Sequence, residues 1–410
     1  MTELQEGIYY AKTRRPGAFF AIIFLQAAKE AGAERAGAVL ADLWQMYQGL
    51  KQGRVRDLDP VVVPHEGDDL HVLVGFGPNA FDLPGMAHPR PRGFEGSLFR
   101  SPQGRGGPLL PGSGLRYAPD MDANPATEHV CVQITAQTKL AVDRAIVETW
   151  KTLLDAVDPA TGIADLAITA FYIGFQRSDR RSWIDFHDGL SNLEADERER
   201  VIVTKPGQDE EWCVGGTYLA FMRIAVDLPA WRKLTRRDQE LLVGRDKLTG
   251  CPLIDIEPDG TLHADPDCPV AGTQIWETPN DPHFAEPPPA VGAEEIRLSH
   301  VHRASHHSDL VDEPRSRRIF RQGYEFLEWQ QGYPGFRLGL NFVSFQDTPA
   351  RVVEILRMDG WLGQVNFGGD PEAQPAGMES LLSVYAAGIY FAPPVVAGEP
   401  FPGAGAFGIT

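Results

Sequence analysis

The stretch AFFAIIFLQ, residues 18–26, opens a regular alternation of apolar runs and amphipathic segments in this 410-residue chain. The run is apolar up to its last residue, which is typical of a strand buried on both faces. The next segment, residues 34–50, has the apolar spacing of one helical face. The residues of that face are Ala36, Val39, Leu40, Leu43 and Tyr47.

The same alternation continues to residue 175. Apolar runs at 70–76, 129–135 and 166–175 predict three more strands. Residues 138–155 predict a second helix, whose apolar face holds Val142, Ile146, Trp150 and Leu153. The order strand–helix–strand–strand–helix–strand is that of a ferredoxin-like unit, an antiparallel sheet with helices on one face. Residues 84–128 are rich in Pro, Gly and Arg without periodicity, and predict a long excursion.

The second half repeats part of this pattern. Strands are predicted at 216–228 and 338–346, and helices at 236–247 and 350–358. The helix starts are marked by capping residues, Thr235 with Asp238 and Thr348 with Pro349.

These patterns together predict an α+β fold of two ferredoxin-like halves with antiparallel sheets. We place the halves at residues 1–178 and 179–410, since a chain of 410 residues exceeds one ordinary core. Proline and glycine are frequent from Pro371 to the end, which predicts a tail that wraps the surface.

Charge and composition narrow the classes of partner. The net charge of −18 argues against nucleic acid, since phosphate binding needs a basic surface, and disfavours anionic membranes. No apolar run approaches the roughly 18 residues of a membrane helix. Arg14-Arg15 before an apolar stretch resembles a twin-arginine export signal, but Pro16-Gly17 and the short run favour a strand. We therefore expect a cytoplasmic protein.

Four cysteines are present, and no two of them have C-x-x-C spacing: Cys131, Cys213, Cys251 and Cys268. They are too few for a disulfide scaffold, and they lack the spacing of a structural zinc site. We expect ordinary small thiols, either buried or at the surface.

The first candidate for chemistry is an Asp-Gly turn after the strand that ends at residue 175. By itself, Asp188-Gly189 is typical of a solvated surface turn. Trp183, Ile184 and Phe186 surround it in the sequence, so the Asp188 carboxylate would be partly desolvated. Desolvation raises the pKa of a carboxyl and makes Asp188 a candidate acid–base group.

The second candidate is a histidine cluster in residues 296–309, which hold four of the eleven histidines: His300, His302, His306 and His307. Imidazole suits zinc and copper, but no carboxylate or cysteine accompanies the cluster at ligand spacing. One axial haem ligand with bystanders is a second interpretation, and a polar surface cluster is a third. The pattern alone leaves all three open.

The third candidate is the arginine-rich stretch RSRRIFR at residues 315–321. A solvated basic patch is its simpler interpretation. The preceding Ile319-Phe320 should be buried and would aim Arg321 inward, where a guanidinium stabilises developing negative charge.

The three stretches occur together and in order, and the chain thereby resembles the dye-decolourising peroxidase family. Phe186-His187-Asp188-Gly189 resembles the distal G-F-x-D-G motif, Ser299-His300-Val301 the proximal histidine segment, and residues 318–324 the distal arginine segment. Residues 216–250 and the tail at 399–403 are also similar. The resemblance covers residue 165 to the end well, and the earlier strands and helices only at the level of element order.

This sequence departs from the family pattern at three positions. Asp185 stands where the distal motif has its first glycine, His302 where an arginine is usual two residues after the proximal histidine, and Gln322 in place of a second arginine. The first departure puts the backbone of the distal loop in question. The second leaves open which residue binds a haem propionate.

The resemblance implies a haem b peroxidase with the haem between the sheets of the two halves. His300 would be the proximal iron ligand, with Asp347 a candidate acceptor for its second ring nitrogen. Asp188 and Arg321 would act on hydrogen peroxide, and an aromatic donor would supply electrons. Further residues would contact the haem: Arg321, Leu340, Phe342, His302 and Phe186. A carboxylate base remains ionised in mild acid, so we expect an acidic optimum.

Three rival functions remain at this stage. A haem carrier of the same fold would use His300 but react slowly with peroxide. A zinc or copper protein would use His302, His306 and His307, and a plain α+β binding module would hold no cofactor. Sheet edges of this fold often pair, which favours a homo-oligomer.

Overall fold

The computed structural model describes residues 3–8, 17–28, 30–58, 69–95, 128–187, 192–193, 195–268, 294–304, 316–356 and 381–409. Within them, the first half has the predicted order of elements, listed here with their bounds: β1 (Phe19–Ala27), α1 (Ala33–Lys51), β2 (His71–Phe76), β3 (Val130–Ala136), α2 (Lys139–Asp155) and β4 (Leu166–Phe175). The strands pair antiparallel in the order β4-β1-β3-β2, which is the ferredoxin-like arrangement.

The second half repeats this arrangement with insertions. Its sheet strands are β5 (Thr217–Val226), β8 (Phe320–Trp329), β9 (Phe336–Gln346) and β10 (Leu382–Ala392). They pair antiparallel in the order β10-β5-β9-β8. The helices are α3 (Ala195–Ile202), α4 (Leu228–Trp231), α5 (Arg236–Val243), α6 (Glu294–Arg297), α7 (His300–Ala304) and α8 (Pro349–Leu356), and β6 (Leu253–Ile256) with β7 (Leu262–Ala264) forms a separate hairpin. The expected α+β fold of two ferredoxin-like halves is confirmed.

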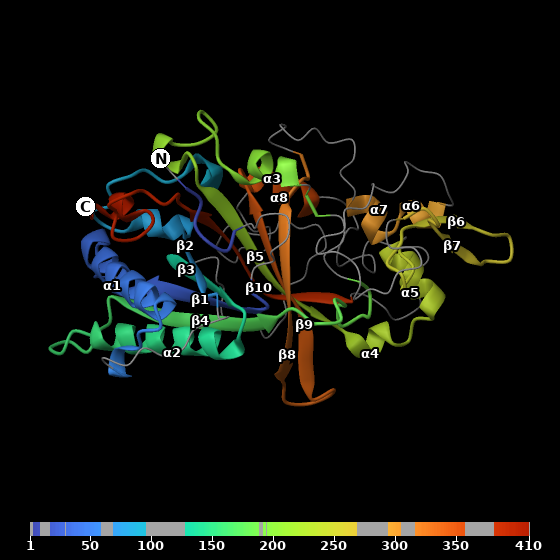
Figure 1. Cartoon of the computed structure of the whole chain (residues 1–410), viewed down its shortest axis with the longest axis horizontal. Coiled ribbons are helices and arrows are strands. Elements are labelled where there is room, and N and C mark those ends of the chain that lie inside the picture. Colours follow the sequence, from blue (N-terminus) through green and yellow to red (C-terminus); the bar gives the residue numbers. More distant parts are fainter. Residues whose placement is uncertain are drawn as a thin grey trace.

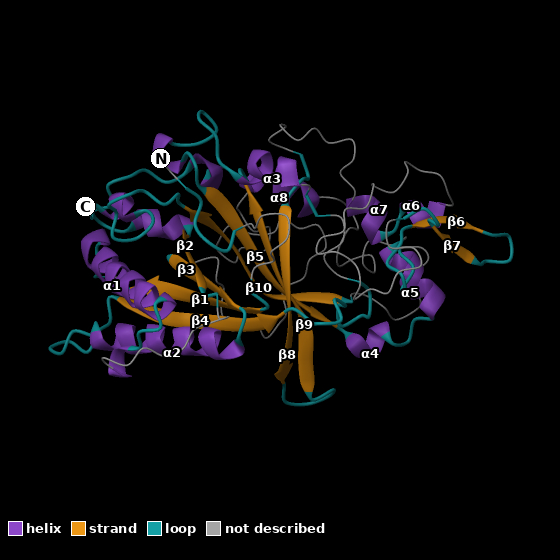
Figure 2. Ribbon diagram, in the orientation of Figure 1, coloured by secondary structure: helices purple, strands orange, loops and turns teal. Residues whose placement is uncertain are grey.

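The two sheets join at their edges into a closed barrel (Figures 1 and 2). The seams are narrow: β10 meets β2 through Phe391 and Phe76, and β4 meets β8 through Phe175 and Glu325. Side chains from both sheets fill the barrel interior and are almost fully buried, among them Phe20, Phe24, Phe221, Tyr324, Phe345 and Tyr390. This packing contradicts the expectation of a haem between the sheets, because close-packed side chains already occupy that space.

The outer face of each sheet is covered by its own helices. α1 and α2 cover the first sheet, together with Phe401 and Phe407 from the chain end. The residues of α4, α5, α7 and α8 form a second apolar cluster with the outward residues of β5 and β10. Figure 1 shows α5, α6, α7 and the β6–β7 hairpin together at the right, away from α1 and α2.

Several boundaries differ from the sequence-based expectation. The C-terminal region is not only a surface tail, because β10 is a buried strand that pairs with β5 along its length. The strand was not predicted from the sequence, because its β-propensity is lowered by three consecutive small residues, Ala386, Ala387 and Gly388. α5 ends at Val243, since Gly244 adopts a left-handed C-cap with φ +87°. Trp150 is exposed, whereas Val142 and Leu153 of α2 are buried.

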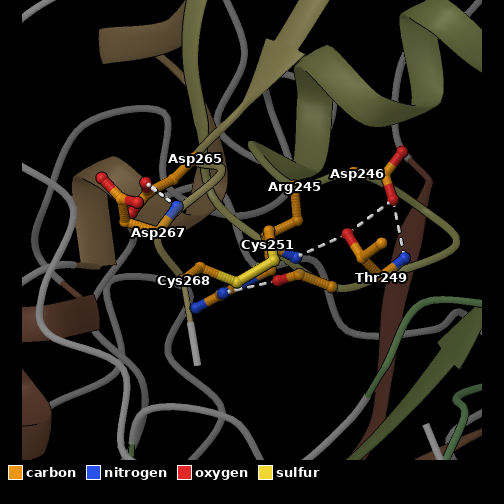
Figure 3. The surroundings of a disulfide bond; sticks show 8 residues. Arg245, Asp246, Thr249, Cys251, Asp265, Asp267 and Cys268 are labelled. Carbon is orange, nitrogen blue, oxygen red and sulfur yellow. Dashed lines mark hydrogen bonds between the residues drawn. A yellow bond between two sulfur atoms is a disulfide. The ribbon is translucent and has the colours of Figure 1, made fainter. Parts of the chain in front are cut away.

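Cys251 and Cys268 form a disulfide with their Cα atoms 5.9 Å apart, which corrects the expectation of free thiols. The β6–β7 hairpin brings the two residues together across 17 positions, a proximity that spacing alone does not reveal. Cys131 and Cys213 are free and buried. Figure 3 shows the disulfide beside the 245–251 turn, in which Asp246 accepts hydrogen bonds from the backbone and hydroxyl of Thr249.

Some expectations lie outside the described residues, including Arg14-Arg15 and most of the excursion at 84–128. The described start of that excursion is anchored to the second half. Asp209 accepts hydrogen bonds from the N–H groups of Arg92 and Gly93 and from the Tyr218 hydroxyl.

None of the described helices is long and apolar enough to span a membrane. The boundary between residues 178 and 179 stays a prediction.

Candidate functional site

The outer face of the second sheet carries three of the candidate residues. Pairing register places Gly323 opposite Phe342, and Phe342 opposite Met222 on the other side. Arg321 lies two residues before Gly323, and Leu340 lies two residues before Phe342. Because side chains two residues apart point to the same side of a strand, all of them lie on one face of the sheet. Arg321, Leu340 and Phe342 are half-buried, whereas the inward residues between them are buried. This face is therefore the one that α4, α5 and α7 cover.

His300 begins α7, and close packing against the end of α5 fixes its place. Ser299 is fully buried. A Cβ at Gly244 would lie 2.2 Å from the Ser299 hydroxyl oxygen, so residue 244 must be glycine for the two segments to approach. Val301 packs into the same apolar cluster as Phe342 and Phe186.

Positive charges from two segments that are distant in sequence act on His300. Arg245 lies in the loop after α5, and Arg321 lies in β8. Burial, together with the positive charges of Arg321 and Arg245, lowers the pKa of His300 to about 4. Burial lowers the pKa of Arg245 to about 9, and Arg321 contributes to the same direction. His300 is thus a neutral imidazole at neutral pH, which is the form that ligates a metal.

The turn before Asp188 packs on the same side. The Phe186 ring meets the Trp231 ring edge-on at 6.2 Å, and the Lys247 ammonium lies 5.5 Å from the Phe186 centroid. Asp185 has φ +68°, a left-handed conformation that glycine adopts most readily and aspartate tolerates. The replacement of the family's glycine by Asp185 therefore keeps a glycine-like turn. Asp188 itself lies outside the described residues.

Asn192 follows this segment and contacts Arg321 directly. Its side chain accepts a hydrogen bond from the Arg321 N–H and donates one to the Arg321 carbonyl oxygen. Asn192 is therefore attached to β8, the strand that carries the candidate arginine.

Two other candidates have local partners. His302 is half-buried, and its Nε2 lies 3.3 Å from the Leu253 carbonyl oxygen of β6. Burial lowers the pKa of His302. Asp347 is fully buried and pairs with Arg351 at 2.6 Å rather than with His300. His306 and His307 lie outside the described residues, and within the described ranges no group of three metal-ligating side chains is gathered.

Sequence reasoning did not select Arg245 or Asn192. Gly244-Arg245 stands inside the stretch that resembles the family, but nothing in the sequence indicates that its charge reaches His300. Asn192 stands four residues after Asp188, and that closeness was the only available signal.

Comparison with known proteins identifies the family. The profile described as Dyp-type peroxidase, C-terminal, matches residues 179–397, which is more than half of the chain. The chain belongs to the Dyp-type peroxidase family. A relative named deferrochelatase, from Escherichia coli, is 26% identical over 170 residues, which cover 40% of this chain and 34% of the relative. The match thus spans about a third of that relative's length.

Solved structures share the fold over nearly the whole chain. A Dyp-type peroxidase from Cellulomonas bogoriensis has a TM-score of 0.67 at 19% identity, covering 98% of this chain and 97% of the other. A variant of DypB from Rhodococcus jostii, in complex with heme, has a TM-score of 0.55 at 16% identity, covering 95% and 96%. At these identities the likeness supports the fold alone.

Proposed function

We propose that this chain is a haem-dependent peroxidase that reduces hydrogen peroxide and oxidises dyes or phenolic and other aromatic donors. His300 is the proximal iron ligand, and Asp188 and Arg321 act on peroxide. The observation that carries the proposal is the convergence of three separate segments, since Phe186, Val301 and Phe342 share one apolar cluster on the outer face of the second sheet.

The residues on this face fit a haem. His300 offers one neutral imidazole for iron, because its pKa is lowered to about 4. Leu340 and Phe342 offer half-buried apolar surface for a flat macrocycle. Arg245 and Arg321 are close enough to lower the pKa of His300, and their guanidinium groups suit carboxylates such as the haem propionates. His302 and Phe186 complete the proposed surroundings.

Held by His300, haem b would supply a redox-active iron for the reduction of peroxide. Asp188 takes a proton from one peroxide oxygen and returns it to the other. Arg321 holds the peroxide and stabilises negative charge that develops on it. Leu340 and Phe342 limit the entry of water. A carboxylate starts from a reference pKa of about 3.9, far below that of imidazole, so Asp188 remains ionised in mild acid even after some desolvation, and activity peaks below neutral pH.

The deciding experiment is an absorption spectrum of protein produced with haem supplied, recorded before and after one equivalent of hydrogen peroxide. A strong Soret band that changes within milliseconds supports the proposal. A band that does not respond favours a haem carrier, and absence of a band refutes the His300 assignment.

Variants separate the roles. His300→Ala should lose the wild-type Soret band, whereas His263→Ala, which changes an exposed histidine of the β6–β7 hairpin, should keep it. Asp188→Asn and Arg321→Leu should keep the Soret band, because His300 still binds the iron and Arg245 remains for a propionate. Both variants should slow the reaction with peroxide about 10²–10³-fold. Wild-type reactivity in both distal variants would refute the distal roles.

A further inference from the structure

The carboxamide of Asn192 pairs with the backbone of Arg321 through both of its polar atoms. Oδ1 accepts a hydrogen bond from the Arg321 N–H at 3.1 Å, and Nδ2 donates one to the Arg321 carbonyl oxygen at 2.8 Å. Oδ1 also accepts from the Leu193 N–H at 3.0 Å. Asn192 is 8% exposed, so water competes little for these bonds.

The edge of β8 explains why an amide side chain is used. β8 pairs with β9 along its whole length, while the described part of β4 pairs with its other edge at Glu325. The N–H and carbonyl of Arg321 that face this second edge meet the Asn192 carboxamide, which carries a donor and an acceptor like the peptide group of a neighbouring strand. Ionised aspartate has nearly the same shape but lacks the donor.

A second attachment holds this contact in place from α3. The Arg198 guanidinium, which is buried, donates to the Leu193 carbonyl oxygen at 3.2 Å. Residues 192 and 193 are therefore held between α3 and β8. The Asn192 carboxamide is thus a fixed hydrogen-bond partner for the backbone of Arg321, whose side chain points to the outer face.

We propose that Asn192 is a positioning residue for Arg321. By pairing with the backbone of β8, it fixes the point from which the Arg321 guanidinium extends on the outer face. The inference rests on the proposed role of Arg321 and assigns no contact with peroxide or haem to Asn192 itself.

The test compares Asn192→Ala and Asn192→Asp with a matched variant, Asn341→Ala. Asn341 lies in the same sheet, is fully buried and bonds through both polar atoms, to the Ile173 carbonyl and the Arg223 guanidinium. It belongs to the inward face of β9, opposite to that of Phe342, so its loss should weaken packing without moving Arg321.

The Asn192 variants should bind as much haem as the wild type. Their kcat/KM for peroxide should fall at least tenfold, while KM for the electron donor stays unchanged. Asn341→Ala should unfold at a lower temperature and keep its kcat/KM per haem. Equal loss of rate in Asn192→Ala and Asn341→Ala, or wild-type rates in both Asn192 variants, would overturn the proposal.

A second measurement needs no haem. In haem-free protein, amide hydrogen exchange at Arg321 should be at least tenfold faster in Asn192→Ala than in the wild type, because the acceptor of that N–H is gone. Unchanged exchange would overturn the inference even if peroxide activity were present. A wild-type holoprotein that is inert to peroxide would instead refute the proposed function, and with it the catalytic consequence of this contact.

Discussion

Arg181 donates a hydrogen bond to the backbone carbonyl of Lys247 at 2.7 Å and thereby joins the turn before Asp188 to the loop after α5. The same guanidinium donates to the carbonyl oxygens of Asp185 at 2.5 Å and Leu248 at 2.9 Å. The loop after α5 also contains Arg245, whose charge acts on His300. One arginine thus attaches the proposed distal side to the loop that borders the proximal side.

Removing this connection should loosen both segments. We expect Arg181→Ala to lower the free energy of unfolding by about 1–2 kcal/mol, because three carbonyl acceptors lose a charged donor at a half-exposed position. Denaturant unfolding of the haem-free protein measures this effect. Arg232→Ala, which changes an exposed arginine at the end of α4, is the control. An unfolding midpoint equal to that of the control would show that the connection contributes nothing.

The disulfide should stabilise the region that bears α7. It closes a segment of 17 positions, for which loop entropy predicts about 3 kcal/mol. Cys251→Ala with Cys268→Ala should lower the free energy of unfolding by that order and speed haem loss to an acceptor protein, because Leu253 of this segment lies against His302. A dithiol reductant should destabilise the wild type and leave the double variant unchanged. Equal sensitivity of both proteins would contradict the prediction.

Asp185 provides a test of backbone conformation. At φ +68° an ordinary side chain costs about 1–2 kcal/mol, whereas glycine has no such cost. Asp185→Gly should therefore be more stable than Asp185→Ala by about 1 kcal/mol in denaturant unfolding. At Glu199, an exposed position of α3, the order of the Gly and Ala variants should be reversed. The same order at both positions would argue against the left-handed turn.

The fold was predictable where the apolar pattern agrees with burial. The run that became β1 is apolar and almost entirely buried, and α1 keeps its apolar spacing through the whole helix. β4 was also predicted from an apolar run, although its Phe171 and Ile173 are exposed. β10 was missed because three consecutive small residues weaken its strand pattern, although β5 supplies a full set of pairing partners. Tertiary pairing decided its structure where local propensity did not.

The candidate site was only partly predictable, because sequence motifs give residue types but not the face on which they meet. The motifs around Phe186, His300 and Phe342 were selected from the sequence, and their roles stay predictions. That Phe186, Val301 and Phe342 share one apolar cluster on the outer face follows from strand register, which the motifs do not contain. Arg245 was missed because its influence on His300 acts through space, from a loop fixed by Gly244.

Stability should depend on pH through His300. Its pKa falls from an ordinary 6.5 to about 4 on folding, so below pH 6.5 the unfolded chain binds a proton that the folded chain does not. The stability of haem-free protein should therefore fall as pH drops from 6.5 towards 4, by no more than about 3 kcal/mol for this group. His300→Gln should show a shallower loss over that window. Identical pH profiles would mean that His300 is not desolvated in the folded chain.

Besides burial, Arg321 should contribute to the lowered pKa of His300 before any haem is bound. Its positive charge is one cause of the lowered value, so Arg321→Leu should raise the pKa of His300, whereas Arg321→Lys, which keeps a charge, should leave it nearly unchanged. Proton NMR of the imidazole in haem-free protein measures both. A pKa that is the same in Arg321→Leu and the wild type would place Arg321 away from His300 and contradict the convergence of β8 and α7. The rate of the peroxide reaction should distinguish Arg321→Lys from the wild type, although the pKa of His300 does not. Lys lacks the forked donor geometry of Arg, so Arg321→Lys should have a rate between those of Arg321→Leu and the wild type.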